Sequence, residues 1–218
     1  LKVADKLIFS KWREALGGNV QLIVAGGAAL QPRLCTIFNA AGIEVAEGYG
    51  MTEASPVISA NRKPSSGDIR VGTVGPALYG IEVKIDEDGE ILCRGDNVMA
   101  GYYKEPALTR EVIDEEGWLH TGDIGVLIDG RYLKITDRKK EMFKLSSGKY
   151  IAPQVIENKL KESSFIEQVM VIGENQKFAS AIISPDFNFL HNWAMRHGID
   201  FRDNRELIQM PAVLERYQ

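Results

Sequence analysis

The sequence predicts an α/β protein that begins with parallel strands and continues with short antiparallel strands. Between residues 5 and 55, apolar runs with helical spacing alternate with strand-like runs. A helix between two strands implies that the strands are parallel. After about Pro56 the apolar runs become short and are separated by glycine. Asp-Gly pairs at 88–89 and 129–130 are typical of tight hairpins.

Residues 1–55 are expected to form the α/β portion. Apolar residues at helical spacing in Asp5–Leu16 predict a helix that ends at Gly17-Gly18. Val20–Ala25 has the composition of a fully buried strand. Pro32 suits the first turn of a second helix, which Gly42 would end.

The second strand of this portion is expected at Ile43–Ala46, and it runs into Glu47–Gly50. We expect Gly26-Gly27 and Glu47–Gly50 to form the loops after the two strands. Parallel sheets bind ligands at the carboxyl ends of their strands. These two glycine-bearing loops are therefore candidates for a binding site.

Residues 56–137 are expected to form a β-rich portion, a small antiparallel sheet or barrel. Its expected strands are residues 72–76, 82–85, 90–94, 125–128 and 133–135. One helix, around Pro106–Ile113, interrupts them.

The charged run Asp137–Glu141 marks a further change, and we place a domain boundary between residues 137 and 138. The expected elements after it are a helix at 153–161, strands at 168–172 and 179–184, a helix at 187–196 and a polar helix to Gln218. This order predicts a smaller α+β domain over residues 138–218.

Composition excludes several classes of protein. The 218 residues include 26 Lys+Arg and 30 Asp+Glu, a net charge of −4, which argues against a nucleic-acid-coating protein. No apolar run approaches the ~18 residues of a membrane span, and the first residues do not resemble a targeting peptide. Cys35 and Cys93 lack C-x-x-C spacing and are expected to be buried, reduced thiols, which favours the cytoplasm. Three scattered histidines argue against zinc.

Two common nucleotide-binding motifs are absent. Ser147–Tyr150 is the nearest approach to a phosphate loop, and it lacks the first glycine and the hydroxyl residue. No G-x-G-x-x-G opens a helix after a strand. The sequence therefore predicts neither a Walker-type site nor a dinucleotide fold.

Several other segments are distinctive in their order and spacing. They are Gly26–Leu30, Tyr49–Glu53, Gly89–Gly95, Gly101–Tyr103, Trp118–Asp123, and Asp137-Arg138 followed by Lys144 and Gly148. Together they resemble the adenylate-forming enzymes, which include acyl-CoA synthetases, luciferases and peptide-synthetase adenylation domains. The resemblance covers essentially the whole chain, and residues 137–153 are most similar to bacterial long-chain fatty acid CoA ligases.

The resemblance implies a fragment of the adenylate-forming large domain, followed by a smaller, mobile and incomplete C-terminal domain. It also implies a reaction in two halves. A fatty acid carboxylate attacks the α-phosphate of ATP, which gives an acyl-adenylate and pyrophosphate, and the thiol of coenzyme A then displaces AMP. ATP, Mg2+ and coenzyme A are the implied cofactors, and no nucleic acid is an implied partner.

A first group of residues is implied to bind the base and the ribose of the nucleotide. Gly27 and Ala28 would line the adenine pocket with backbone atoms, and Tyr49, followed by Gly50, would stack on the purine. Asp123 would accept hydrogen bonds from the ribose hydroxyls, because a carboxylate has two acceptor oxygens.

Other residues are implied to act on the phosphates or in the domain movement. Thr52 would bind a phosphate oxygen, and Glu53 would help to hold Mg2+, which prefers carboxylate oxygen. Arg138 would donate to ribose or phosphate. Lys140 matches the hinge position, and Lys144 would enter the site in the second half-reaction.

Two elements of the family's pattern are missing from the sequence: a Ser/Thr/Gly-rich phosphate loop with its lysine, and a lysine near the C-terminus. We therefore expect the chain alone to be an inactive fragment, with an exposed apolar face through which two chains could pair. Peripheral contact with the inner membrane stays open. So do two alternatives, namely an adenylation enzyme for aryl, amino or shorter acyl acids and a non-catalytic adenylate-binding module.

Overall fold

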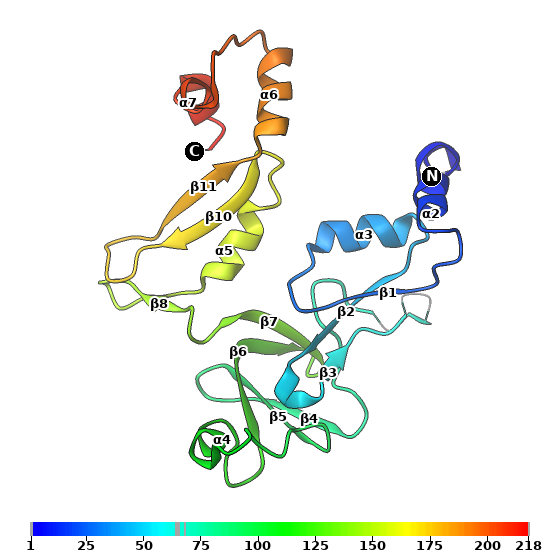
Figure 1. Ribbon diagram of the computed structural model, residues 1–218, viewed down its shortest axis with the longest axis vertical. Coiled ribbons are helices and arrows are strands. Elements are labelled where there is room, and N and C mark those ends of the chain that lie inside the picture. Colours follow the sequence, from blue (N-terminus) through cyan, green and yellow to red (C-terminus); the bar gives the residue numbers. More distant parts are fainter. Residues whose placement is uncertain (1, 64–65, 68, 218) are drawn as a thin grey trace. The chain divides into compact units, whose positions relative to one another are not determined.

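A computed structural model describes residues 2–63, 66–67 and 69–217 (Figure 1). The chain divides into two compact units, Leu1–Met142 and Phe143–Gln218. The boundary expected between residues 137 and 138 lies within the first unit, because strand β7 (Tyr132–Arg138) carries both residues in its sheet.

The first unit begins with helical turns, as the sequence predicts. They are α1 (Lys2–Ala4), the π-helical turn η1 (Asp5–Phe9) and α2 (Ser10–Ala15). Gly17 and Gly18 come next with φ of 84° and 74°, a left-handed backbone that ends the helix.

Two parallel strands come after these turns, separated by a helix (Figure 1). Strand β1 (Ile23–Ala25) pairs in parallel with β2 (Val45–Gly50), and α3 (Pro32–Ala40) connects them. This confirms the β-α-β prediction. Strand β3 (Val57–Ala60), which the sequence analysis missed, adds to β2 in antiparallel orientation.

Two details of this portion were predicted wrongly. A fully buried strand was expected at Val20–Ala25, but the strand that forms, β1, is shorter. It is also not fully buried, because Val24 is 63 % exposed. The reason is that, among the described residues, β1 is an edge strand with β2 alone beside it. Glu47–Gly50 is not a loop but the second half of β2, because Tyr49 pairs with Ser59 of β3.

Four antiparallel strands form the β-rich portion in the order β4-β5-β6-β7. The new members are β4 (Ile81–Ile85), β5 (Glu90–Gly95) and β6 (Leu119–Ile128), and the helix α4 (Pro106–Val112) precedes β6. The Asp-Gly pairs form the β4–β5 and β6–β7 hairpins, as expected. The strand expected at 72–76 does not form, because Gly72 and Gly75 have left-handed φ of 81° and 80°.

A buried cluster joins the two sheets of the first unit. Its members are Tyr49, Ala54, Ile58, Ile91, Cys93, Leu119 and Leu133. Cys93 lies in this core and Cys35 lies elsewhere in the same unit, both buried and unpaired, as predicted.

The second unit has α+β structure. Its elements are β8 (Phe143–Lys144), β9 (Tyr150–Ile151), α5 (Pro153–Leu160), β10 (Ile166–Ile172), β11 (Ser180–Pro185), α6 (Phe187–Arg196), α7 (Asn204–Leu207) and α8 (Pro211–Leu214). Strands β8 and β9 form one antiparallel pair, and β10 and β11 form another.

The single polar helix expected up to Gln218 was a wrong prediction. Two short helices, α7 and α8, stand in its place. Pro211 begins α8, and a proline favours the first turn of a new helix over the interior of a longer one. Gln218 itself lies outside the described residues.

Within the described part of the chain, no helix combines the length and apolar character needed to cross a membrane.

Gly50 is expected to be intolerant of any side chain. A Cβ built on it would lie 1.7 Å from the Pro56 carbonyl oxygen, a backbone atom that cannot move alone. We expect Gly50→Ala to cost about 3 kcal/mol or more, as overpacking does. Gly130→Ala is the control, because a Cβ there meets nothing within 4 Å, although its φ is 65°. Thermal unfolding measured by circular dichroism should show the larger loss for Gly50→Ala, and equal losses would contradict the packing argument.

Candidate active site

A hydrogen bond between Tyr49 and Asp123 brings the two sheets of the first unit together at one point. Tyr49 Oη donates to Asp123 Oδ2 at 2.6 Å, although 74 residues separate them in sequence. Tyr49 ends the buried part of β2 and is 7 % exposed, whereas Asp123 lies within β6. Burial, more than the bond to Asp123, raises the pKa of Tyr49. The phenol therefore stays protonated and remains a donor.

Arg138 faces the other oxygen of the same carboxylate. Arg138 and Asp123 are paired in the β6–β7 register, and Arg138 Nε lies 3.6 Å from Asp123 Oδ1. Each carboxylate oxygen has more than one acceptor position, so Asp123 can accept further hydroxyl donors. The arrangement suits a vicinal diol next to an anionic group.

Thr52 and Glu53 lie in a short turn just after β2. The turn is the 3-10 helix η2 (Thr52–Ala54), in which Thr52 is exposed and Glu53 is half-buried. Met99 N–H donates to the Glu53 carbonyl at 2.8 Å, and Tyr102 Oη donates to Glu53 Oε1 at 2.9 Å. The turn is thus held by a distant loop that the sequence analysis did not assign to the site.

Glu53 has the chemistry of one ligand for a magnesium ion that is held mainly by phosphate oxygens and water. Among the described residues, no group of three or more His, Cys, Asp and Glu side chains could hold a metal by itself. Mg2+ in phosphate-transfer sites is commonly held by one or two carboxylates, with waters and substrate phosphates completing its shell. A single half-buried carboxylate at Glu53 matches that pattern.

Gly27 and Ala28 lie in the loop that follows β1, after Gly26. Gly27 has φ of 78°, and a Cβ there would meet nothing within 4 Å. The close approach belongs to Gly26, whose Cβ would lie 3.2 Å from the Gly48 carbonyl oxygen. Gly27 is therefore required for its left-handed backbone, and Gly26 for its closeness to β2.

Glu90 is a buried carboxylate to which the sequence analysis gave no role, although it lies in the distinctive segment Gly89–Gly95. Its side chain is 5 % exposed and accepts from Gly122 N–H (2.8 Å) and Lys139 Nζ (2.7 Å), while His120 Nδ1 lies 3.1 Å away. Burial acts to raise the pKa of Glu90, but these partners together lower it below its ordinary value. Its signals in the sequence are its place in the Gly89–Gly95 segment and a charge at the start of an apolar strand.

Lys139 and Lys140 behave differently although they are neighbours. Lys139 Nζ also lies 2.5 Å from Asp88 Oδ2, so it is tied to the β4–β5 hairpin. Lys140 lies in an exposed turn in which Glu141 N–H donates to the Arg138 carbonyl at 2.9 Å. Lys139 is thus held by two carboxylates, and Lys140 follows it in the turn close to the end of the first unit.

Lys144 belongs to the second unit and is exposed in β8. Its Nζ lies 5.4 Å from the centroid of the Tyr150 ring in β9. Of the residues to which the sequence analysis gave a role, it is the one outside the first unit.

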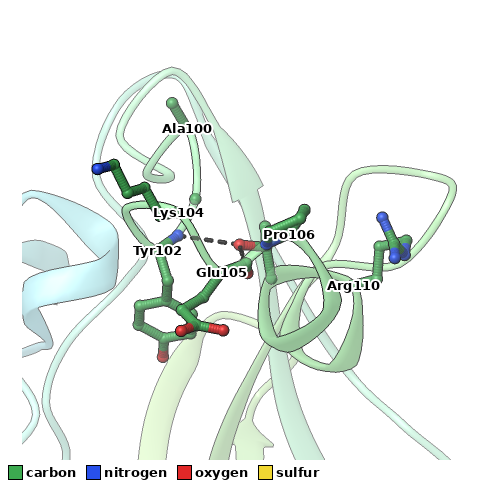
Figure 2. A pocket seen from close by; sticks show the side chains of 8 residues that line it. Ala100, Tyr102, Lys104, Glu105, Pro106 and Arg110 are labelled. Carbon is green, nitrogen blue, oxygen red and sulfur yellow. Dashed lines mark hydrogen bonds between the residues drawn. The ribbon is translucent and has the colours of Figure 1, made fainter.

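Figure 2 shows a pocket of about 470 Å3 beside Tyr102, between the turn at 101–105 and the start of α4. Tyr102 N–H donates to Thr109 Oγ1 there at 2.9 Å. Lys104 and Arg110 extend on opposite sides of the pocket, so their charges do not converge on one point.

Comparison with protein families finds two matches. Residues 2–103 match the model described as AMP-binding enzyme, and residues 140–197 match the model described as AMP-binding enzyme C-terminal domain.

Curated relatives extend over most of the chain. It is 41 % identical to the peroxisomal long chain acyl-CoA synthetase 6 of Arabidopsis thaliana, over 96 % of this chain and 32 % of that protein. It is 43 % identical to long-chain-fatty-acid–CoA ligase 1 of Cavia porcellus, over 91 % of this chain and 30 % of the relative. The chain thus spans about a third of the length of these relatives.

Among solved structures, the O-succinylbenzoate coenzyme A synthetase of Bacillus subtilis, in complex with ATP and magnesium ion, is similar. Its TM-score is 0.67 at 25 % sequence identity, over 81 % of this chain and 40 % of that chain. This likeness supports the adenylate-forming fold.

The ion cluster at Glu90 predicts a pH-dependent stability. A lowered folded-state pKa contributes stability that is present above the unfolded value, ~4.3, and is lost as the pH falls through the folded value. We expect Glu90→Gln to destabilise the fold by about 1–3 kcal/mol at neutral pH. The difference from the wild type should shrink in acid.

The control is Glu87→Gln, since Glu87 is exposed in the same hairpin. Thermal unfolding measured from pH 7 downward should show little difference for this variant. A loss for Glu90→Gln that is the same in acid as at neutral pH would contradict an electrostatic cause.

Proposed function

The chain belongs to the AMP-binding enzyme family, and we propose that the protein containing it is a long-chain fatty acid CoA ligase. Such a ligase forms an acyl-adenylate from ATP and passes the acyl group to coenzyme A. The observation that carries the proposal is the Asp123 carboxylate held between Tyr49 and Arg138, in the unit whose η2 turn bears Glu53. The similarity to long-chain acyl-CoA synthetases along most of the chain supports it.

Asp123 is proposed to accept the ribose hydroxyls. Tyr49 orients Asp123, and Arg138 adds a permanent positive charge that ribose or phosphate oxygens can share. Gly27 and Ala28 lie at the carboxyl end of β1, the edge at which parallel sheets bind ligands, and are proposed to face the adenine. The small exposed part of the Tyr49 ring, next to Gly50, is proposed to contact the purine.

Thr52 and Glu53 are proposed to act on the phosphates. The exposed Thr52 hydroxyl would donate to a phosphate oxygen, and Glu53 would hold Mg2+. When bound, Mg2+ would neutralise phosphate charge and make the α-phosphate more susceptible to the attacking carboxylate. The protein's part is to fix the Glu53 carboxylate in place. Tyr102 and Met99, which lie outside the η2 turn, do so through their hydrogen bonds to Glu53.

Lys140 and Lys144 are proposed to serve the second half-reaction. Lys140 lies in an exposed turn close to the end of the first unit, where a change of backbone dihedrals would reorient the residues C-terminal to it. The exposed Lys144 would then supply a positive charge to the thioester-forming site.

The location and assembly of the protein are also proposed. Buried, unpaired Cys35 and Cys93 support a reducing compartment such as the cytoplasm. Exposed apolar side chains in the first unit, among them Val3, Leu7 and Val24, support pairing of two chains through apolar surface. Peripheral contact with the inner membrane stays a prediction.

The proposal is tested by ATP–pyrophosphate exchange in the full-length protein, with short, medium and long fatty acids and with aryl and amino acids. We expect exchange to be greatest with long fatty acids. Asp123→Asn should reduce it by about 100-fold, because it removes a charged acceptor of ribose hydroxyls. Asp129→Asn is the matched control, since Asp129 is an exposed hairpin residue paired with Arg70.

A maximum with an aryl or amino acid would change the substrate class. No exchange with any acid, in a folded protein, would favour the non-catalytic adenylate-binding module.

The hinge is tested by Lys140→Pro. Proline restricts φ, so we expect acyl-adenylate formation to continue while thioester formation falls roughly tenfold or more. Both half-reactions are to be measured separately in the full-length protein. Lys140→Ala leaves the backbone free and should restore thioester formation. Unaltered thioester formation in Lys140→Pro would show that rotation does not occur here.

A further inference from the structure

The contact between Tyr102 and Glu53 joins two loops that are distant in sequence. The phenol donates to Glu53 Oε1 at 2.9 Å, across 49 residues. Both side chains are half-buried. This is the bond through which a residue outside the distinctive Tyr49–Glu53 segment touches the carboxylate proposed to hold Mg2+.

The backbone around Glu53 is fixed by the same loop. Met99 N–H donates to the Glu53 carbonyl at 2.8 Å, and Asn97 Nδ2 donates to the Ala54 carbonyl at 3.1 Å. Residues 97–102 thus hold the η2 turn by hydrogen bonds to two of its backbone carbonyls and to one of its side chains. With the turn held, the remaining freedom of Glu53 lies in its own side-chain torsions.

Tyr102 is itself held from behind by α4. Its N–H donates to Thr109 Oγ1 at 2.9 Å, and its carbonyl accepts from Glu105 N–H at 3.1 Å. Gly101 has φ of 137°, and a Cβ there would lie 2.8 Å from Thr109 Cγ2. Glycine at 101 therefore permits the close contact that fixes Tyr102 against Thr109.

The chemistry of the donor matters as much as its position. A lysine or arginine at this place would neutralise the carboxylate, whereas a phenol orients Oε1 and leaves the negative charge in place. A carboxylate fixed in this way presents its other oxygen, Oε2, in one direction.

We propose that Tyr102 is a positioning residue, whose hydroxyl holds Glu53 Oε1 so that Oε2 is presented to the divalent cation accompanying the triphosphate. The inference rests on the proposed function, which places the cation at Glu53. Residues that hold a metal-binding carboxylate commonly affect metal affinity strongly when they are removed.

The test compares Tyr102→Phe with Tyr103→Phe in the full-length protein. Tyr103 is the adjacent tyrosine and is 86 % exposed, so the same change is made without the bond to Glu53. Binding of Mn2+ in the presence of a non-hydrolysable ATP analogue is measured by electron paramagnetic resonance. We expect the Mn2+ dissociation constant to rise about tenfold in Tyr102→Phe and to stay unchanged in Tyr103→Phe.

Kinetics supply a second readout of the same pair. In pyrophosphate exchange, the Mg2+ concentration for half-maximal rate should rise in Tyr102→Phe, while the KM for the fatty acid stays at the wild-type value. If Tyr102→Phe does not fold, Thr109→Val removes the hydroxyl that holds Tyr102 and should shift Mn2+ binding in the same direction, by a smaller factor. Unchanged Mn2+ binding in a folded Tyr102→Phe would overturn the proposal.

Glu53→Gln separates this inference from the proposed function. We expect it to weaken Mn2+ binding by itself, and we expect Tyr102→Phe to add nothing in that background. If Glu53→Gln leaves Mn2+ binding unchanged, the proposed role of Glu53 fails, and the inference fails with it. If Glu53→Gln weakens binding but Tyr102→Phe matches Tyr103→Phe, the role of Glu53 stands and Tyr102 only holds the loop.

Discussion

The hydrogen bond from Tyr49 to Asp123 is the constraint on which the geometry of the first unit depends. It joins the end of a parallel strand to the middle of an antiparallel one, at 2.6 Å, next to the cluster that contains Ile58, Ile91 and Leu119. A buried phenol can make such a bond without neutralising its partner, so the carboxylate keeps its charge and still faces Arg138. The bond consequently holds the end of β2, and the η2 turn that follows it, close to strand β6 of the β6–β7 hairpin.

Four acidic side chains of this unit show how the partner decides the role of a carboxylate. One oxygen of Asp123 accepts from the Tyr49 phenol, and the Arg138 guanidinium lies near the other. The Glu53 carboxylate accepts from the Tyr102 phenol, its one side-chain partner among the described residues. Both side chains are thereby held in one orientation. Glu90 is enclosed by a lysine, a histidine and a backbone N–H, and it serves the fold. Burial raises the pKa of Glu47, whose Oε2 has no hydrogen-bond partner among the described residues.

Local patterns predicted most of the elements because the interactions that form them are local. Helix α3 begins at Pro32 and is followed by Gly42, and the Asp88-Gly89 turn joins two strands, all as expected. The wrong predictions depended on neighbours that a local pattern does not contain. Burial at Val24 required a second strand beside β1, and the loop expected at Glu47–Gly50 became a strand because β3 pairs with it. The helix expected up to Gln218 was divided where Pro211 begins a new one.

The sequence by itself determined the family resemblance, most of the helices and strands, and the identity of residues whose chemistry suits a nucleotide, such as Thr52, Glu53 and Asp123. These depend on residue type and short spacings. Only the tertiary structure decided which side chains hold these residues in place. Tyr102 reaches Glu53 across 49 residues, and Glu90 gathers Gly122 and Lys139 from two further strands or turns. Such contacts depend on how the strands pair and on the paths of the loops between them. The spacing of residues along the chain does not show which distant residues will be in contact.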